Sequence, residues 1–445
     1  MKTSLSAKET IAIGLMLFAL FFGAGNMIFP PQLGQAAGEN VLPAIIGFLL
    51  TGVGLPLLGV IAVALTGSAK GLADKAHPVF GTILIVSIYL TIGPLFAIPR
   101  TGNVSYVIAV EPFLGKQSSG IYLFIFTLIF FGITYFLALN PSKLVDRIGK
   151  ILTPILLVVI AILVIKAFIT PMGEIGAVTK AYQSAPLFTG FLEGYKTMDA
   201  IASIVFAIVV ITAIQERGVT NPKSIAASCI KAGIVAAAGL ALVYVSLAYL
   251  GATSVDTVGS LDNGGQILSK ASAFLFGSFG NVVLGVAILF ACLTTSVGLV
   301  SSCGEYFSKL IPSLSYKTVV IIVSLFSLVI ANFGLNEIIS LSVPILSALY
   351  PLAIVVIFLS FIDKLFKERR EVYIGTTLAT GIFSIIDGLN AAKIPLGTLN
   401  EFLGQHIPFY SFGIGWLIPA IIGGIIGYIL TFFIPVSPDR LKKVS

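Results

Sequence analysis

The feature that most constrains this chain is a succession of apolar runs, each about as long as a lipid bilayer is thick. A helix that crosses the hydrocarbon core needs about 20 mainly apolar residues, and about a dozen such helices would take up nearly all of the 445 residues. Only 10% of the residues are charged, while 57% are hydrophobic; soluble domains carry about 25% charge. The sequence therefore predicts an all-α polytopic membrane protein and excludes a soluble domain, a disordered chain and a disulfide scaffold.

About twelve apolar spans can be placed along the chain. No linker is long enough to separate soluble domains, so residues 1–445 are expected to form a single transmembrane domain. The first apolar run follows a short basic start but no convincing cleavage site follows it, and we expect it to be a retained helix rather than a signal peptide. The predicted spans are 10–22 with a continuation near 28, 43–65, 79–110, 120–139, 148–168, 187–214, 224–250, 280–307, 317–333, 338–361, 372–389 and 414–433.

The loop cations predict the orientation of these spans. If the N-terminus is cytoplasmic, 19 Lys and Arg residues fall on the cytoplasmic side and six on the other, with Arg100 remaining. Cytoplasmic loops are enriched in Lys and Arg, so this bias predicts cytoplasmic N- and C-termini and an even number of spans. The 19 are Lys2, Lys8, Lys70, Lys75, Lys143, Arg147, Lys150, Arg217, Lys223, Lys231, Lys309, Lys317, Lys364, Lys367, Arg369, Arg370, Arg440, Lys442 and Lys443, and the six are Lys116, Lys166, Lys180, Lys196, Lys270 and Lys393.

Two spans that lie five apart are interrupted. The first contains Gly-Ala-Gly-Asn at 23–26 before two prolines, and the sixth contains Gly-Tyr-Lys-Thr-Met-Asp at 194–199. Paired interruptions in corresponding halves are typical of inverted repeats. The sequence therefore predicts two five-helix repeats, over 9–170 and 185–362, followed by two further helices over 371–435.

Interrupted helices are expected to line a binding site. Unwound backbone is tolerated at membrane depth only where it is buried in protein or lines a cavity. The N-terminus of a half-helix favours an anion such as a carboxylate, while freed carbonyls can hold an ammonium or a metal cation. The alternative, glycine used only for close helix packing, is weaker for the first break because an asparagine and two prolines follow it. Candidate ligand-binding residues are Gly23, Ala24, Gly25, Asn26, Tyr195, Thr197 and Asp199.

The eighth span carries three successive hydroxyl residues, Thr294, Thr295 and Ser296. One interpretation is an ion site, because neutral oxygens suit a hard cation such as Na⁺. The alternative is that each hydroxyl donates a hydrogen bond to a carbonyl of its own helix. Beside two broken helices, the ion site is the favoured interpretation.

Charged side chains at membrane depth are functional candidates by default. Asp199 adjoins the second break and is a candidate for this reason. The alternative is that it is an acid at the membrane boundary. Arg100 and Glu305 are candidate gating residues, with an exposed interfacial arginine and a solvated helix end as the respective alternatives. The three cysteines lack metal-ligand spacing and are expected to be small buried hydrophobes.

The stretches FALFFGAGNMIFPPQLGQAAG, GYKTMDA and ACLTTSVGL together resemble the bacterial branched-chain amino acid:cation symporter family, over essentially the full length. This resemblance implies the leucine-transporter fold and the import of leucine, isoleucine and valine across the cytoplasmic membrane, driven by Na⁺ or H⁺. It implies carboxylate binding by the backbone of residues 23–26. It also implies a sodium site formed by Ala19, Phe22, Ala291, Thr294 and Thr295. No arginine precedes Pro30, unlike in better-studied members of the fold, so the gate is expected to be built differently, with Arg100 as the candidate.

Competing functions are weaker but distinct. A cation-coupled transporter of another small neutral amino acid, such as alanine or serine, is the main alternative. An intramembrane enzyme would need a nucleophile–base or metal constellation, and the only two histidines lie in predicted loops. A channel would need charge rings or a filter loop. No ATP-binding P-loop motif occurs, and the scattered cations argue against binding of nucleic acid. The expected partners are therefore the amino acid, Na⁺ or H⁺, and the lipid bilayer. No cofactor is expected beyond the coupling ion.

Overall fold

The computed structural model describes residues 2, 4–115, 120–139 and 143–434, without the side chains of 143–153. Among the cations used above, Lys116, Arg440, Lys442 and Lys443 lie outside the described residues, and the side chains of Lys143, Arg147 and Lys150 are not described. All regular structure in the described part is helical, which confirms the predicted all-α class.

The predicted spans correspond to twelve helices or helix combinations in the described part of the chain. Seven helical runs are long and apolar enough to cross a bilayer, the first of which, 24–66, is here divided between the first and second spans, and the bent pair α11 and α12 makes an eighth. Helix α1 and three shorter apolar helices supply the rest. In chain order the spans are α1 (Ala7–Phe21) with α2 (Ala24–Ala37), α3 (Val41–Leu49) with α4 (Leu55–Thr66), α6 (Pro78–Leu90) with α7 (Ala97–Ala109), α9 (Gly120–Leu139), α10 (Lys143–Ile169), α11 (Pro186–Tyr195) with α12 (Asp199–Gln215), α13 (Pro222–Ala252), α15 (Gly264–Leu310), α16 (Tyr316–Ala331), α17 (Leu335–Ile362), α18 (Arg370–Ala391) and α20 (Leu417–Leu430).

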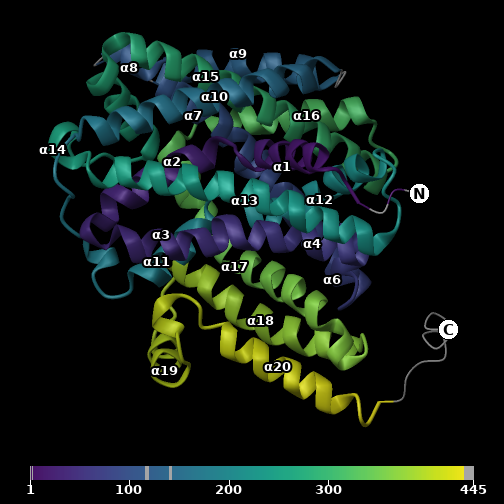
Figure 1. The fold of residues 1–445 in the computed structure, drawn as a ribbon. Coiled ribbons are helices and arrows are strands. Elements are labelled where there is room, and N and C mark those ends of the chain that lie inside the picture. The colour runs from purple at the N-terminus through teal and green to yellow at the C-terminus, as the bar shows by residue number, and fades with distance from the viewer. Residues whose placement is uncertain (1, 3, 116–119, 140–142, 435–445) are drawn as a thin grey trace.

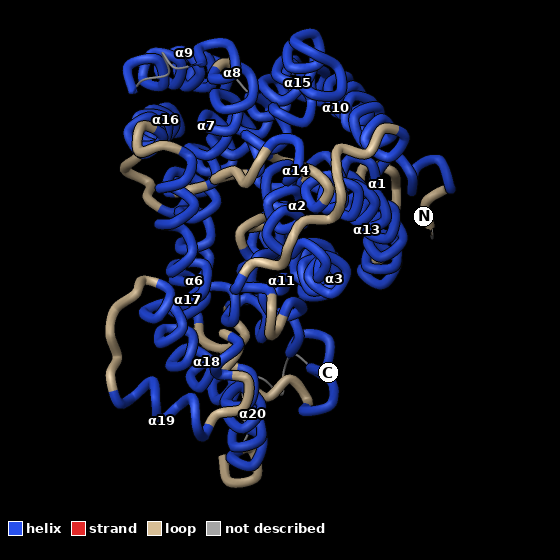
Figure 2. Tube along the Cα trace, turned by 90° about the vertical axis from the view of Figure 1, so that its left-hand side faces the viewer, coloured by secondary structure: helices blue, strands red, loops and turns tan. Residues whose placement is uncertain are grey.

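The spans run roughly side by side, so the bundle has two ends (Figure 1). Helix α1 begins and α20 ends at one of them, which we call the N-terminal side. Three short connecting helices lie at the other end, which we call the opposite side. They are α8 (Glu111–Leu114), α14 (Val255–Val258) and α19 (Thr398–His406). Helices α18, α19 and α20 form a group at the edge of the bundle (Figure 2).

Local sequence signals explain where several helices begin. Ser6 and Glu9 form a reciprocal capping box at the start of α1, so two otherwise unpaired N–H groups are satisfied. The side chains of Asn221 and Ser315 cap α13 and α16 in the same position. These caps fix the starts of helices whose length is otherwise set by apolar residues.

Two predicted spans differ in detail from the structure. The span predicted at 79–110 is interrupted by a π-helical turn, η3 (Thr91–Leu95), in which Gly93 leaves helical geometry immediately before Pro94. Proline lacks an N–H and clashes with the preceding turn, which accounts for this break. The span predicted to start at 280 belongs to the 47-residue α15, whose direction changes at Gly277 with φ +66°; only glycine adopts this conformation without strain.

Helices α2 and α13 pack closely against each other at the centre of the bundle. A Cβ on Gly34 would lie 1.9 Å from the Ala248 carbonyl oxygen, and one on Gly251 would lie 2.0 Å from the Pro31 carbonyl oxygen. Both contacts admit only glycine. The side chain of Tyr244, about two turns before Gly251 on α13, is thereby brought against the start of α2.

Candidate functional site

The first predicted break is confirmed, but it is shorter than expected. Helix α1 ends at Phe21 and α2 begins at Ala24, so only Phe22 and Gly23 are non-helical. The Gly23 N–H would reach the Ala19 carbonyl in a continuous helix, yet it donates to Oδ1 of Asn26 at 3.2 Å. The Ala19 carbonyl is therefore released from the helical ladder. The first-turn N–H groups of α2 have no partner within the helix.

The second predicted break is also confirmed. Helices α11 and α12 meet at an angle of 45° across residues 196–198. Met198 has φ +66°, an uncommon conformation for a non-glycine residue. The Thr197 hydroxyl donates to the Gly194 carbonyl at 2.9 Å and accepts from the Asp199 N–H at 3.3 Å, which holds the turn.

A buried hydrogen-bond network joins the two breaks. The Asn26 side-chain amide donates to Oδ2 of Asp199 at 2.5 Å and to the Tyr244 hydroxyl. The Tyr244 hydroxyl in turn donates to Oδ2 of Asp199 at 3.2 Å. All three residues are buried. Because buried polar groups are costly unless paired, this triad fixes the start of α2 relative to the start of α12.

Arg100 on α7 contacts both breaks. It is 2% exposed, so the interfacial reading is wrong. Its Nη1 donates to the Lys196 carbonyl at 2.6 Å, and its guanidinium lies 5.0 Å from the centre of the Phe29 ring. A Cβ on Gly25 would lie 3.1 Å from the same Nη1. The guanidinium therefore lies between α2 and the turn that ends α11. Its contacts are with protein groups, whereas an exposed arginine would contact water.

Thr295 of α15 lies beside the first break. Thr295 lines the same cavity as Gly23, and a Cβ on Gly23 would lie 3.6 Å from Thr295 Cγ2. The Thr294 and Thr295 hydroxyls donate to the Ala291 carbonyl at 2.9 and 3.0 Å. This is the back-bonding arrangement that the sequence left as an alternative. It leaves the lone pairs of both hydroxyl oxygens available as ligands, because each hydroxyl only donates in these bonds.

A central cavity of about 50 Å³ lies among these groups. Its walls come from α1, α2, α7, α12, α15 and both breaks, and include Gly23, Ala24, Gly25, Asn26, Arg100, Thr197, Asp199 and Thr295. Two of the four half-helix ends at this cavity have a side-chain charge that offsets their helix dipole. Arg100 binds a carbonyl at the C-terminal end of α11, and Asp199 lies in the first turn of α12. The N-terminus of α2 has no carboxylate of its own in its first turn.

The remaining candidates lie elsewhere. Tyr195 lines a different cavity, on the other side of the second break. Glu305 is exposed on α15, one to two turns before the end of that helix. Tyr244 and Phe29 belong to the centre but were not anticipated. A tyrosine inside an apolar helix is not distinguishable in sequence from a packing residue, so no signal pointed to Tyr244. The three cysteines are free and buried, as expected.

The fold is that of leucine-transporter-like secondary transporters. The chain superposes on the inward-facing conformation of Mhp1 with a TM-score of 0.62 at 16% identity, covering 95% of this chain and 90% of the other. It superposes on MhsT in complex with L-phenylalanine with a TM-score of 0.55 at 14% identity, covering 97% and 98%. These likenesses define the class of fold.

Residues 6–434 match the profile described as branched-chain amino acid transport protein. The chain is 68% identical to the branched-chain amino acid permease BraB of Bacillus subtilis over the full length of both, and 50% identical to the permease BrnQ of the same organism, covering 97% and 99%. A branched-chain amino acid transport system 2 carrier protein of Pseudomonas aeruginosa is 48% identical, with 94% of each chain covered. The chain belongs to the branched-chain amino acid transport protein family, and it is a multi-pass membrane transporter rather than an enzyme.

Proposed function

We propose that the chain is a symporter that imports leucine, isoleucine and valine together with a cation by alternating access. The observation that carries this proposal is the convergence of two half-helix breaks on one buried cavity, joined by Asn26, Asp199 and Tyr244. A zwitterion needs an anion site and a cation site within a few ångströms. At the breaks, the N-terminus of α2 can serve as the anion site and freed carbonyls can serve as the cation site.

In this proposal the first-turn N–H groups of Ala24, Gly25 and Asn26 bind the substrate carboxylate. The ammonium is held by carbonyls of the first break and by Asp199. The side chain of the amino acid takes up the apolar part of the cavity, towards Leu20, Phe206 and Leu299. The cavity has room for a few water molecules only, so substrate binding requires the half-helices to separate.

The coupling ion is assigned to Na⁺, with H⁺ as the alternative. The proposed oxygen set consists of the carbonyls of Ala19, Phe22 and Ala291 and the hydroxyls of Thr294 and Thr295. Its support is that Thr295 lines the same cavity as Gly23 of the first break. Oxygen-only sets suit hard cations. No group of three or more His, Cys, Asp or Glu residues in the described part of the chain could hold a transition metal.

The N-terminal side of the bundle is assigned to the cytoplasm. Helix α1 begins there (Figure 1), and the loop cations favour that side by 19 to six. The protein would thus lie in a bacterial cytoplasmic membrane with both termini inside, and the opposite side would face outward.

A competition panel tests the substrate assignment. The protein is reconstituted into liposomes and the initial rate of radiolabelled leucine uptake is measured with each amino acid as competitor. Isoleucine, an isomer of leucine, should compete about as well as leucine, and valine, which is one methylene shorter, should compete about 10- to 200-fold less well, because one methylene changes binding by about 1–3 kcal/mol. Stronger competition by alanine or serine than by valine would favour the small-amino-acid alternative and contradict the proposal.

A further inference from the structure

A second cavity lies on the opposite side and shares no lining residue with the central one. Its volume is about 780 Å³, and its walls come from α11, α17, α18, residues 180–185 and the 3₁₀ turn η7 (Tyr410–Phe412). Tyr195 and Lys196 line this cavity, whereas Thr197 and Asp199 line the central one. The turn between α11 and α12 is therefore the partition between the two. Lys180, Ser184 and Phe412 are exposed, so the larger cavity reaches the surface.

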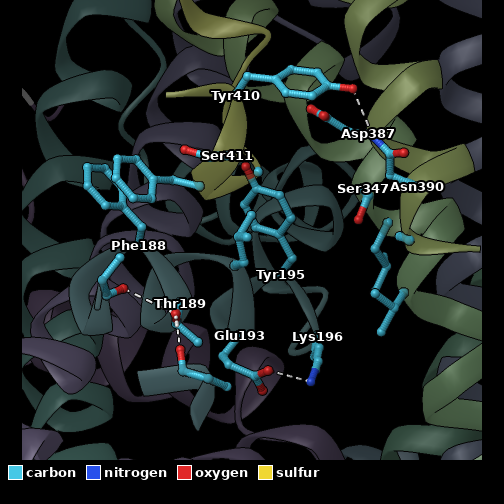
Figure 3. A pocket seen from close by; sticks show the side chains of 18 of the residues that line it. Phe188, Thr189, Glu193, Tyr195, Lys196, Ser347, Asp387, Asn390, Tyr410 and Ser411 are labelled. Carbon is cyan, nitrogen blue, oxygen red and sulfur yellow. Dashed lines mark hydrogen bonds and ion pairs between the residues drawn. The ribbon is translucent and has the colours of Figure 1, made fainter. Parts of the chain in front are cut away.

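Asp387 lines this cavity without a hydrogen-bond partner for its buried oxygen. The residue is 9% exposed, and its Oδ2 makes no hydrogen bond with any described residue. Figure 3 shows Asp387 beside Tyr410, with Tyr195 in the middle of the cavity and the Glu193–Lys196 ion pair at the far end. A buried carboxylate left without a partner is costly.

Asn390 and Tyr410, which also line the cavity, bond to each other and to Asn400 rather than to Asp387. The Asn390 amide donates to the Tyr410 hydroxyl at 3.0 Å, and the Asn400 amide donates to Oδ1 of Asn390 at 2.6 Å. The Tyr410 hydroxyl donates to Oδ1 of Asn400 at 2.5 Å. This closed ring ties the end of α18 to α19 and η7 and so builds the cavity wall. It leaves the carboxylate of Asp387 for a ligand.

The surroundings indicate the chemistry of that ligand. An ammonium group would supply the charge-assisted hydrogen bonds that the carboxylate lacks. The cavity walls combine polar side chains with an apolar part that includes Phe188, Leu192, Val343 and Leu346. The cavity is far larger than a metal ion, and Asp387 belongs to no cluster of metal-ligating side chains among the described residues. The match is an organic ammonium with a short apolar chain.

We propose that this cavity is a second binding site for the amino acid, in which Asp387 binds the ammonium group and the apolar wall accepts the branched side chain. The inference rests on the proposed function for the identity of the ligand. It adds a site separated from the central one by the α11–α12 turn.

Binding stoichiometry tests the inference. The purified full-length chain in lipid nanodiscs is equilibrated with saturating radiolabelled leucine in Na⁺ buffer, and bound leucine is counted per chain. We expect two equivalents for the unmodified chain and one for Asp387→Asn, which keeps the shape of the side chain. Isopentylamine, which is leucine without its carboxylate, should displace one equivalent, and 4-methylpentanoate, which lacks the ammonium, should displace none from this site. In Asp387→Asn the affinity for isopentylamine should fall by about tenfold to a hundredfold.

Two controls keep the outcomes separate. Glu401→Gln removes an exposed carboxylate on α19, outside the cavity, and should retain two equivalents. Asp387→Glu keeps the carboxylate and should retain isopentylamine binding. A chain that transports leucine but shows the same stoichiometry with and without Asp387→Asn overturns this inference alone. A chain that neither transports nor binds leucine overturns the proposed function and this inference with it.

Discussion

Exchanging the amide and the carboxylate between positions 26 and 199 tests the centre of the site. Asn26→Asp keeps the side-chain shape and the oxygen that accepts from Gly23 N–H, but it removes the donor to Asp199 and Tyr244 and places two carboxylates in contact. Asn26 and Asp199 are 2% and 4% exposed, so water cannot screen the change. A hydrogen bond to a charged group contributes about 1.5–3 kcal/mol. We expect Asn26→Asp to lower the free energy of unfolding by about 3 kcal/mol.

The double variant Asn26→Asp with Asp199→Asn restores an amide–carboxylate hydrogen bond in the reverse direction. The coupling energy between the two changes should therefore be favourable by about 2 kcal/mol, within the range for residues in contact. Unfolding can be followed in detergent with a thiol-reactive dye, because Cys229, Cys292 and Cys303 are all free and buried. At about 2 cal/mol/K per residue, a loss of 3 kcal/mol corresponds to roughly a 3 °C fall in Tm.

Stability and transport should separate in this experiment. The double variant should recover most of the lost Tm, yet its leucine uptake should stay low, because a carboxylate at position 26 repels the substrate carboxylate from the N-terminus of α2. A single variant as stable as the unmodified chain, or a double variant no more stable than the weaker single, would refute the hydrogen-bond reasoning. Full recovery of uptake would refute the carboxylate site.

Three further outcomes follow from the contacts described. Gly25→Ala should slow leucine uptake by about tenfold or more, because its Cβ would lie 3.1 Å from Arg100 Nη1 and 3.2 Å from Phe29 Cε2; Gly132→Ala, with open space around it, should transport normally, and equal rates would contradict the steric argument. Thr294→Ala with Thr295→Ala should raise the Na⁺ concentration for half-maximal uptake, and an unchanged value would remove α15 from the ion site. Lys75→Met should destabilise the chain by about 3 kcal/mol, since it leaves the buried Asp363 without its ion-pair partner; combining it with Asp363→Leu should recover most of the Tm, and no recovery would show that the pair is not coupled.

The sequence predicted the two breaks because each interrupts an apolar run with residues that the membrane interior does not tolerate in plain helix. Glycine and asparagine at 23–26, and lysine and aspartate at 196–199, are visible without any tertiary information. The residue bounds of the two repeats, 9–170 and 185–362, remain predictions.

What the sequence could not supply is the pairing between distant helices. Tyr244 reaches Asn26 across 218 positions, and only the close approach of α2 and α13 brings them together. The burial of Arg100 depends likewise on Phe29 and the Lys196 carbonyl. Asp387 is a different case, because an acid within the apolar run 372–389 is visible in the sequence alone as a functional candidate.

The most direct test of cation-coupled symport is leucine accumulation in proteoliposomes under imposed ion gradients. Interior and exterior leucine start equal, and an inward Na⁺ gradient, an inward H⁺ gradient or no gradient is applied. Cation-coupled symport predicts that leucine accumulates inside above its exterior concentration under the Na⁺ gradient, with H⁺ as the alternative driving ion, and that accumulation collapses when the gradient is dissipated. Leucine that only equilibrates under every gradient would contradict cation-coupled symport.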